Sequence, residues 1–178
     1  MQTFLEKTAR YLLDTAGKKP DQMCVVLPNR RAGLFLKRNI AQLIDKPVWA
    51  PAVMSIEDFV FRISGFQSIE PVYLLFELYE IYRETDKERA APFEEFLGWG
   101  QVVLNDFNDL DMHLTNADEL FNFLNDVKAL NLWNPDGTAL TSFQVEYLRF
   151  FNSLAEFYLK LKERLLNSRK VYQGLAYR

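Results

Sequence analysis

The chain has 178 residues, of which 49% are hydrophobic and 15% aromatic, so it can bury a core in one domain or two small ones and does not have a disordered composition. It has no run of the roughly 18 apolar residues that a membrane-spanning helix needs, and residues 1–7 lack the pattern of a secretory signal, so we expect a cytoplasmic protein with no membrane partner. The net charge of −3 is unevenly distributed: residues 1–49 hold 9 Lys and Arg against 4 Asp and Glu, residues 50–148 hold 5 against 18, and residues 149–178 hold 7 against 2. This pattern predicts a localised anion-binding face rather than a uniformly basic protein.

The first segment predicts a helix over residues 3–16, closed by Gly17 as a C-cap. Residues 17–19 (GKK) resemble the end of a phosphate-binding loop. A Walker A motif, however, needs a strand in front and a Ser or Thr after the lysine. Here a helix comes first and neither hydroxyl follows, so we expect no ATP-binding loop and no cofactor.

Residues 23–27 (MCVVL) form an apolar run typical of a strand buried on both faces of a parallel sheet. Cys24, the only cysteine, is then a small core residue. Pro28 ends the strand, and Asn29 suits the N-cap of a following helix of about three turns. The apolar residues expected on the inner face of that helix are Ala32, Phe35, Leu36, Ile40, Leu43 and Ile44.

The unusual feature of this helix is the pair Arg30 and Arg31 at its start. Cations there face the positive end of the helix dipole, which costs about 0.3–1 kcal/mol each when exposed. An anionic ligand would explain them, because helix N-termini at the carboxyl ends of parallel strands are common phosphate sites. Lys37 and Arg38 extend the positive charge along the helix. The alternative is that both arginines are solvated or pair with a carboxylate elsewhere.

A second junction of the same kind follows. Residues 52–54 (AVM) predict a strand beside the first, and Ser55 with the acids after it resembles a capping box. The helix should turn Phe59, Val60 and Ile63 inward and stop at Gly65. We therefore expect the two strand-to-helix junctions to lie side by side at one sheet edge.

From Pro71 onwards the pattern indicates helices only. We expect helices that start near Pro71, Pro92, Asn116 and Ser142, and a turn at residues 134–137. The stripes expected to face the core are Val72, Leu75, Phe76, Tyr79 and Tyr82; Leu74, Leu78 and Ile81; Phe96, Trp99, Val103, Phe107 and Leu110; Leu120, Phe121, Leu124 and Val127; and Phe143, Tyr147, Phe150, Phe151, Leu154, Phe157, Tyr158, Leu161 and Leu165. The tail, Val171 to Arg178, shows no stop signal, so we expect the given sequence to end within a longer chain.

Residues 105–111 hold the densest group of carboxylates, in Asp106, Asp109 and Asp111. The group lacks the glycine and glutamate spacing of a calcium loop. On a helix, Asp106 and Asp109 share a face whereas Asp111 points away, so a solvated acidic face is favoured over a metal site. His113, the only histidine, has no neighbouring pattern of a zinc site or a catalytic triad. We expect no metal and no catalytic residue in this chain.

Three runs together resemble a known family: residues 25–33 (VVLPNRRAG), 49–51 (WAP) and 55–59 (SIEDF). They are similar to the amino-terminal part of AddB-type proteins of Bacteroides-like bacteria, which are inactivated superfamily 1 helicases of double-strand break repair. Residues 104–111 (LNDFNDLD) are similar to the helical insertion of that family.

In superfamily 1 helicases, a strand ending in Thr-Asn before a basic residue opens a helix that contacts single-stranded DNA, and residues 27–33 resemble it with Pro28 in place of the threonine. A second DNA-contacting motif, Thr-x-His-Ser, resembles residues 55–58, but Glu57 and Asp58 replace His and Ser and would repel phosphate. Larger family members carry a PD-(D/E)XK nuclease domain and pair with an AddA-like helicase-nuclease subunit. The resemblance therefore implies DNA and such a subunit as partners.

We thus expect a helix-dominated α/β chain: a small parallel-sheet unit like a degenerate P-loop helicase over residues 1–66, then an acidic, all-helical domain over residues 67–178. The predicted function is non-catalytic DNA binding within a recombinational repair helicase-nuclease. The DNA-binding residues expected are Asn29, Arg30, Arg31, Lys37, Arg38 and Ser55. Two alternatives remain: a protein-interaction scaffold without DNA contact, and a phosphate-binding enzyme with an unrecognised nucleotide site.

Overall fold

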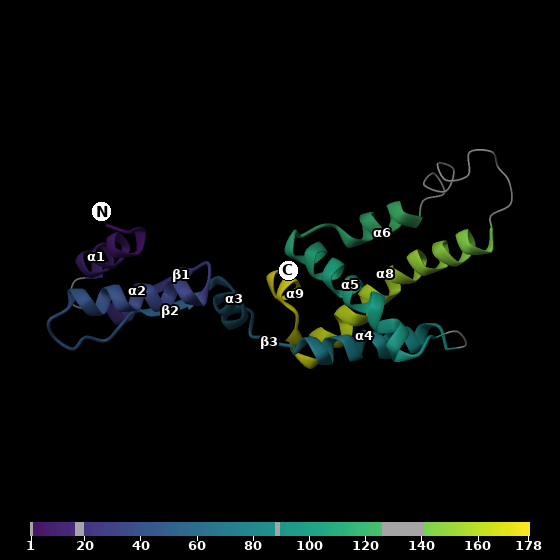
Figure 1. Cartoon of the computed structure of the whole chain (residues 1–178), viewed down its shortest axis with the longest axis horizontal. Helices are drawn as coiled ribbons and strands as arrows, with labels where there is room; N and C mark the ends of the chain where they lie inside the picture. Colours follow the sequence, from purple (N-terminus) through teal and green to yellow (C-terminus); the bar gives the residue numbers. More distant parts are fainter. Residues whose placement is uncertain (1, 17–19, 88–89, 126–140) are drawn as a thin grey trace. The chain divides into compact units, whose positions relative to one another are not determined.

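The computed structural model describes residues 2–16, 20–87, 90–125 and 141–178 (Figure 1). Over these residues it is a helix-dominated α/β structure with two small parallel sheets, which confirms the expected fold class. The chain divides into two compact units, Met1–Gly65 and Phe66–Arg178. None of the helices described is both long enough and apolar enough to cross a membrane.

The first unit is a two-stranded parallel sheet with helices. Its elements are α1 (Phe4–Ala16), the short 3-10 helix η1 (Pro20–Gln22), β1 (Cys24–Leu27), α2 (Arg30–Leu43), β2 (Ala52–Ser55) and α3 (Ile56–Ser64). The two strands pair in register from Cys24 opposite Ala52 to Leu27 opposite Ser55. The core forms where the sheet and helices α1 and α2 meet, and its buried residues are Ala9, Leu12, Leu27, Leu36 and Ile40.

The sheet of the first unit is covered on one face only, which corrects the prediction of a strand buried on both faces. Val25 packs against the core, whereas Cys24 and Val26 are exposed in the described structure. Successive side chains of a strand point to opposite faces, so only every second residue of β1 meets the helices. The inward positions expected for Phe35 and Ile63 are also wrong, because both side chains are exposed. The inward position expected for Leu43 is wrong for the same reason.

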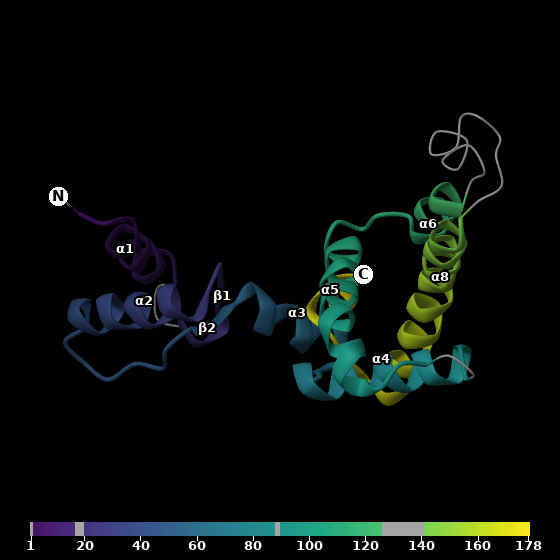
Figure 2. The same cartoon turned by 45° about the vertical axis from the view of Figure 1, so that its right-hand side comes forward.

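The second unit is mainly helical. Its elements are β3 (Gln67–Ser68), α4 (Pro71–Thr85), α5 (Phe93–Met112), α6 (Ala117–Asn125), α8 (Ser142–Ser168), β4 (Lys170–Val171) and α9 (Gln173–Tyr177). Helices α6 and α8 lie side by side in both ribbon views (Figure 2). Strands β3 and β4 form a short parallel pair, with Gln67 opposite Lys170 and Ser68 opposite Val171, which the helical pattern did not indicate.

The core of the second unit is rich in aromatic rings. The stripes predicted on α5 and α8 are buried at Phe96, Val103, Phe107, Leu110, Phe157, Tyr158, Leu161 and Leu165. On α4, Leu74, Leu75, Leu78 and Ile81 are buried, but Val72 and Phe76 are exposed, so this helix is covered over less of its circumference than expected. The expected turn at residues 134–137, Val127, and the side chains of Phe143 and Tyr147 lie outside what the structure describes.

The tail packs closely against α5, although no sequence signal indicated it. Tyr172 and Leu175 are buried, and the Gly174 amide donates to Asn108 Oδ1 at 2.9 Å. A Cβ atom at Gly174 would lie 2.3 Å from the Asn108 carbonyl oxygen. Only glycine therefore permits this approach of α9 to α5.

Candidate nucleic-acid interface

The two strand-to-helix junctions of the first unit lie beside each other, as predicted. Asn29 Oδ1 accepts from the Ala32 amide at 2.8 Å and caps α2. Ser55 Oγ accepts from the Asp58 amide at 3.1 Å and caps α3, which ends at Gly65 in a left-handed conformation. Both N-caps satisfy amides that a helix start leaves without partners. Asn29 and Ser55 thus have structural roles that need no ligand.

Arg30, at the start of α2, makes a bidentate ion pair with Asp58, at the start of α3. Arg30 Nε donates to Asp58 Oδ2 at 3.0 Å and Nη2 donates to Oδ1 at 2.5 Å, while Ser55 Oγ donates to Oδ2 at 2.7 Å. The hydrogen bond from Arg30, and then that from Ser55, hold the pKa of Asp58 well below its usual range. The bond to Asp58 likewise raises the pKa of Arg30. For Arg30, therefore, the alternative of a carboxylate partner is correct.

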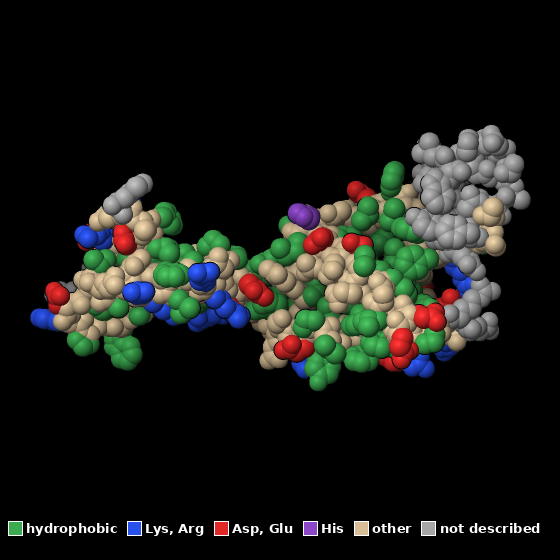
Figure 3. Space-filling model, viewed as in Figure 1, with side chains coloured by type: hydrophobic (Ala, Val, Ile, Leu, Met, Phe, Trp, Pro, Cys, Tyr) green, Lys and Arg blue, Asp and Glu red, His purple; other side chains and the backbone are tan. Residues whose placement is uncertain are grey.

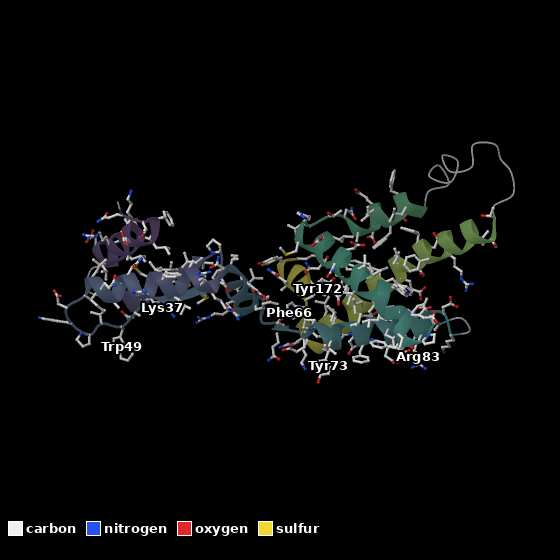
Figure 4. All side chains as sticks on the ribbon, viewed as in Figure 1. Lys37, Trp49, Phe66, Tyr73, Arg83 and Tyr172 are labelled. Carbon is white, nitrogen blue, oxygen red and sulfur yellow. The ribbon has the colours of Figure 1, made fainter. Side chains whose placement is uncertain are left out.

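The other three cations lie on the outer surface of α2. Seven residues make almost two helical turns, so Lys37 follows Arg30 along one line and Arg38 follows Arg31 along the next. All four side chains are exposed, and the opposite side of the helix carries the buried residues Gly33, Leu36 and Ile40. Figure 3 shows Lys and Arg side chains gathered over α2, and Figure 4 places Lys37 there.

Within the described part of the chain, Arg31, Lys37 and Arg38 form no ion pair. Their charge is therefore available to a ligand, in contrast to that of Arg30. We call the exposed side of α2 that carries Arg31, Leu34, Lys37 and Arg38 the cationic face.

Apolar side chains lie among these cations, which sequence reasoning missed. Leu34 is 69% exposed, and the Phe35 ring is also exposed with the Arg31 guanidinium 5.9 Å from its centre. Trp49, on the segment between α2 and β2, is 84% exposed (Figure 4). The helical spacing of Phe35 suggested an inner position, but Leu36 takes that place because it points directly at the sheet core.

The acidic group on α5 divides into exposed and buried members. Asp106 and Asp109 are exposed, as expected of a solvated face, whereas Asp111 is fully buried. Asp111 accepts from Tyr158 Oη at 2.6 Å and Tyr172 Oη at 2.5 Å and pairs with Arg178 Nε at 2.6 Å. Asp111 thus points away from the face of Asp106 and Asp109, as helical spacing predicted, but its burial was not predicted because its partners come from α8 and the tail, far away in sequence.

The described residues include no group of three or more His, Cys, Asp or Glu side chains that could hold a metal ion. Residues 17–19, expected not to form an ATP-binding loop, lie outside the described ranges. His113 is exposed at the C-cap of α5.

Comparison of the chain with protein-family models and with curated proteins finds no match.

Proposed function

We propose that the cationic face of α2 binds a DNA strand without catalysing a reaction, as the DNA-guiding part of an AddB-like repair protein. The observation that carries this proposal is the exposure of Arg31, Lys37 and Arg38 on one side of one helix, without carboxylate partners among the described residues. Cations in such a row can follow a phosphate backbone, and they confer affinity without sequence choice. An AddA-like helicase-nuclease would be the protein partner.

The Phe35 ring beside the cationic face also supports a nucleic-acid ligand. Surfaces that bind single strands combine cations with exposed aromatic rings on which bases stack. Phe35 lies next to Arg31 and is exposed, so α2 carries both cations and an exposed aromatic ring. Arg30 contributes less to the attraction because Asp58 offsets its charge.

A second candidate function is a protein-interaction scaffold. The Arg30–Asp58 ion pair and the exposed side chains of Leu34 and Trp49 favour it, because apolar side chains on a surface often mark protein contacts. In that case the same helix would bind a protein partner and have no affinity for DNA.

The experiment measures binding of a fluorescent single-stranded oligonucleotide to the full chain by anisotropy. We expect Arg31→Gln with Arg38→Gln to weaken binding by about ten-fold or more, since each lost phosphate contact removes favourable counterion release. The matched control is Lys7→Gln with Arg10→Gln, which removes the same charge from exposed positions on α1 and should bind almost as the unaltered chain does.

Equal losses in the two double variants would show that only net charge matters and would contradict the proposal. Absence of binding by the unaltered chain would contradict it as well. If the Arg31→Gln, Arg38→Gln variant kept its affinity for DNA but lost binding to a protein partner, the scaffold function would replace the proposed DNA-binding function.

A further inference from the structure

An apolar strip crosses α4 and α5 on the surface of the second unit. Val72 and Tyr73 precede Phe76 by four and three residues on α4, so the three side chains are neighbours on that helix. Phe76 stacks on Phe93 of α5 with ring centres 4.8 Å apart, and Leu97 lies one turn further along α5. The Phe76–Phe93 stack thus joins the two helices into one surface, which we call the α4–α5 strip.

The strip is exposed although its members are large and apolar. The exposed fractions are 63% for Val72, 68% for Tyr73, 46% for Phe76 and 47% for Leu97. Figure 3 shows hydrophobic side chains along the α4 side of this unit with acidic ones beside them, and Figure 4 labels Tyr73 there. Single exposed apolar residues are common, but a continuous patch across two helices marks a contact surface.

Carboxylates surround the strip, and cations are scarce. Helices α4 and α5 together carry eight Asp and Glu residues and a single basic residue, Arg83. Arg164 of α8 already pairs with Glu77 and Glu84. Exposed carboxylates next to the strip are Glu70, three residues before Tyr73, and Glu94, next to Phe93. Glu80, four residues after Phe76, is also exposed, and it forms an exposed ion pair with Arg83 at 3.5 Å.

We infer that the α4–α5 strip is a docking surface for an amphipathic helix of a protein partner, with apolar residues on one side and Lys or Arg along its edges. The apolar side of such a helix would cover Tyr73, Phe76 and Leu97, and its cations would face Glu80 and Glu94. In recognition of this kind an amphipathic helix lays its apolar side on an apolar surface, and acidic residues at the edge select a basic ligand. The inference concerns the second unit and does not depend on DNA binding by α2.

The test uses a synthetic amphipathic helix of leucine and lysine as the probe and the full chain as the receptor, with affinity measured by isothermal titration calorimetry. We expect Tyr73→Asp and Leu97→Asp each to weaken binding by about ten-fold, a change of roughly 1.4 kcal/mol. These positions are chosen because neither side chain takes part in the ring stack, so the variants should fold. Glu80→Gln with Glu94→Gln should weaken binding by a few-fold.

The matched controls introduce the same negative charge at exposed apolar residues that do not belong to the strip, Val102 on α5 and Leu159 on α8. Val102→Asp and Leu159→Asp should bind the probe as the unaltered chain does, and circular dichroism should show equal helix content in all variants. Equal weakening by the controls would overturn the inference. So would failure of the unaltered chain to bind the probe, or equally tight binding of a probe with glutamate in place of lysine.

Discussion

Arg30 shows how a residue's partner depends on strand register. Arg30 and Asp58 are 28 residues apart, and they meet because Leu27 pairs with Ser55 and each strand runs directly into a helix. The sequence predicted both strands and both caps, so the two junctions could be placed side by side. The choice of Asp58 as the partner of Arg30 could not be predicted, because it depends on the register of β1 and β2 and on the side-chain reach across them.

Replacing Arg30 by Ala should raise the pKa of Asp58 towards the ordinary value of about 4. The hydrogen bond from Arg30 is the main cause of the lowered pKa, and the weaker bond from Ser55 would remain. Because the folded pKa is lowered, the stability that Asp58 contributes is present above its ordinary pKa and is lost as the pH falls below it. Carbon-13 NMR titration of the Asp58 carboxyl checks this, and an unchanged titration would show that the ion pair is absent in solution.

Asp111 is the residue whose partners sequence reasoning could not identify. Helical spacing places Asp106 and Asp109 on one exposed side of α5 and turns Asp111 away from it, but it does not indicate which groups Asp111 would contact. These groups belong to Tyr158, Tyr172 and Arg178, whose polar atoms converge on Asp111 only after α8 and the tail have packed on α5.

Asp111→Ala should lower the free energy of unfolding of the second unit by about 3 kcal/mol or more, because it leaves a partly buried guanidinium without its anion. Asp109→Ala removes an exposed carboxylate from the same helix and should change stability by less than about 0.5 kcal/mol. Urea unfolding followed by circular dichroism measures both. Similar losses in the two variants would mean that Asp111 is not buried in solution.

Alkaline pH should destabilise the second unit. Burial, and then the bond to Asp111, raise the pKa of Tyr158 and Tyr172 above the ordinary value of about 10. The stability linked to these protons is therefore complete below pH of about 10 and falls as the pH rises further, since unfolding releases them. Thermal unfolding between neutral and alkaline pH should show this decline, with a smaller decline for Tyr172→Phe. An equal decline for that variant would contradict the assignment.

At the scale of elements, the pattern predicted the strands, caps and main helices better than it predicted which faces are covered. Periodicity indicates that a helix has an apolar side, but Phe35 and Phe76 lie at its margin and are exposed in the described structure. The tail gave no helical period because β4 and α9 are very short and are held by tertiary contacts, β4 with β3 and α9 with α5. Helices α5 and α8 were predictable because each is long enough for its apolar residues to repeat several times at helical spacing.

Gly174→Ala should loosen the tail from α5, since its new Cβ would meet the Asn108 backbone oxygen at 2.3 Å. Hydrogen exchange should become faster over residues 170–178, and stability should fall by at least about 1 kcal/mol. Gly98→Ala is the control: it lies within α5, its Cβ has nothing within 4 Å, and it should stabilise the helix by up to about 1 kcal/mol. Unchanged exchange in the Gly174 variant would contradict the close approach described here.

At the scale of the whole molecule, the two units carry opposite charge. Residues 1–65 hold ten Lys and Arg against six Asp and Glu, whereas residues 66–178 hold 11 against 18. This asymmetry was visible in the sequence and supports different ligands for the two units: a polyanion for α2 and a basic helix for the α4–α5 strip. Composition alone could not locate either surface, because only the fold separates Arg31, Lys37 and Arg38 from the paired Arg30.

The salt dependence of single-strand binding tests the central claim most directly. A plot of the logarithm of the binding constant against the logarithm of salt concentration has a slope of about −0.7 for each phosphate neutralised. Replacing Arg31, Lys37 and Arg38 together by Gln should therefore make the slope shallower by about 2. The Lys7→Gln, Arg10→Gln control should keep the slope of the unaltered chain. An identical slope for the triple variant and the unaltered chain would show that the strand binds elsewhere or not at all.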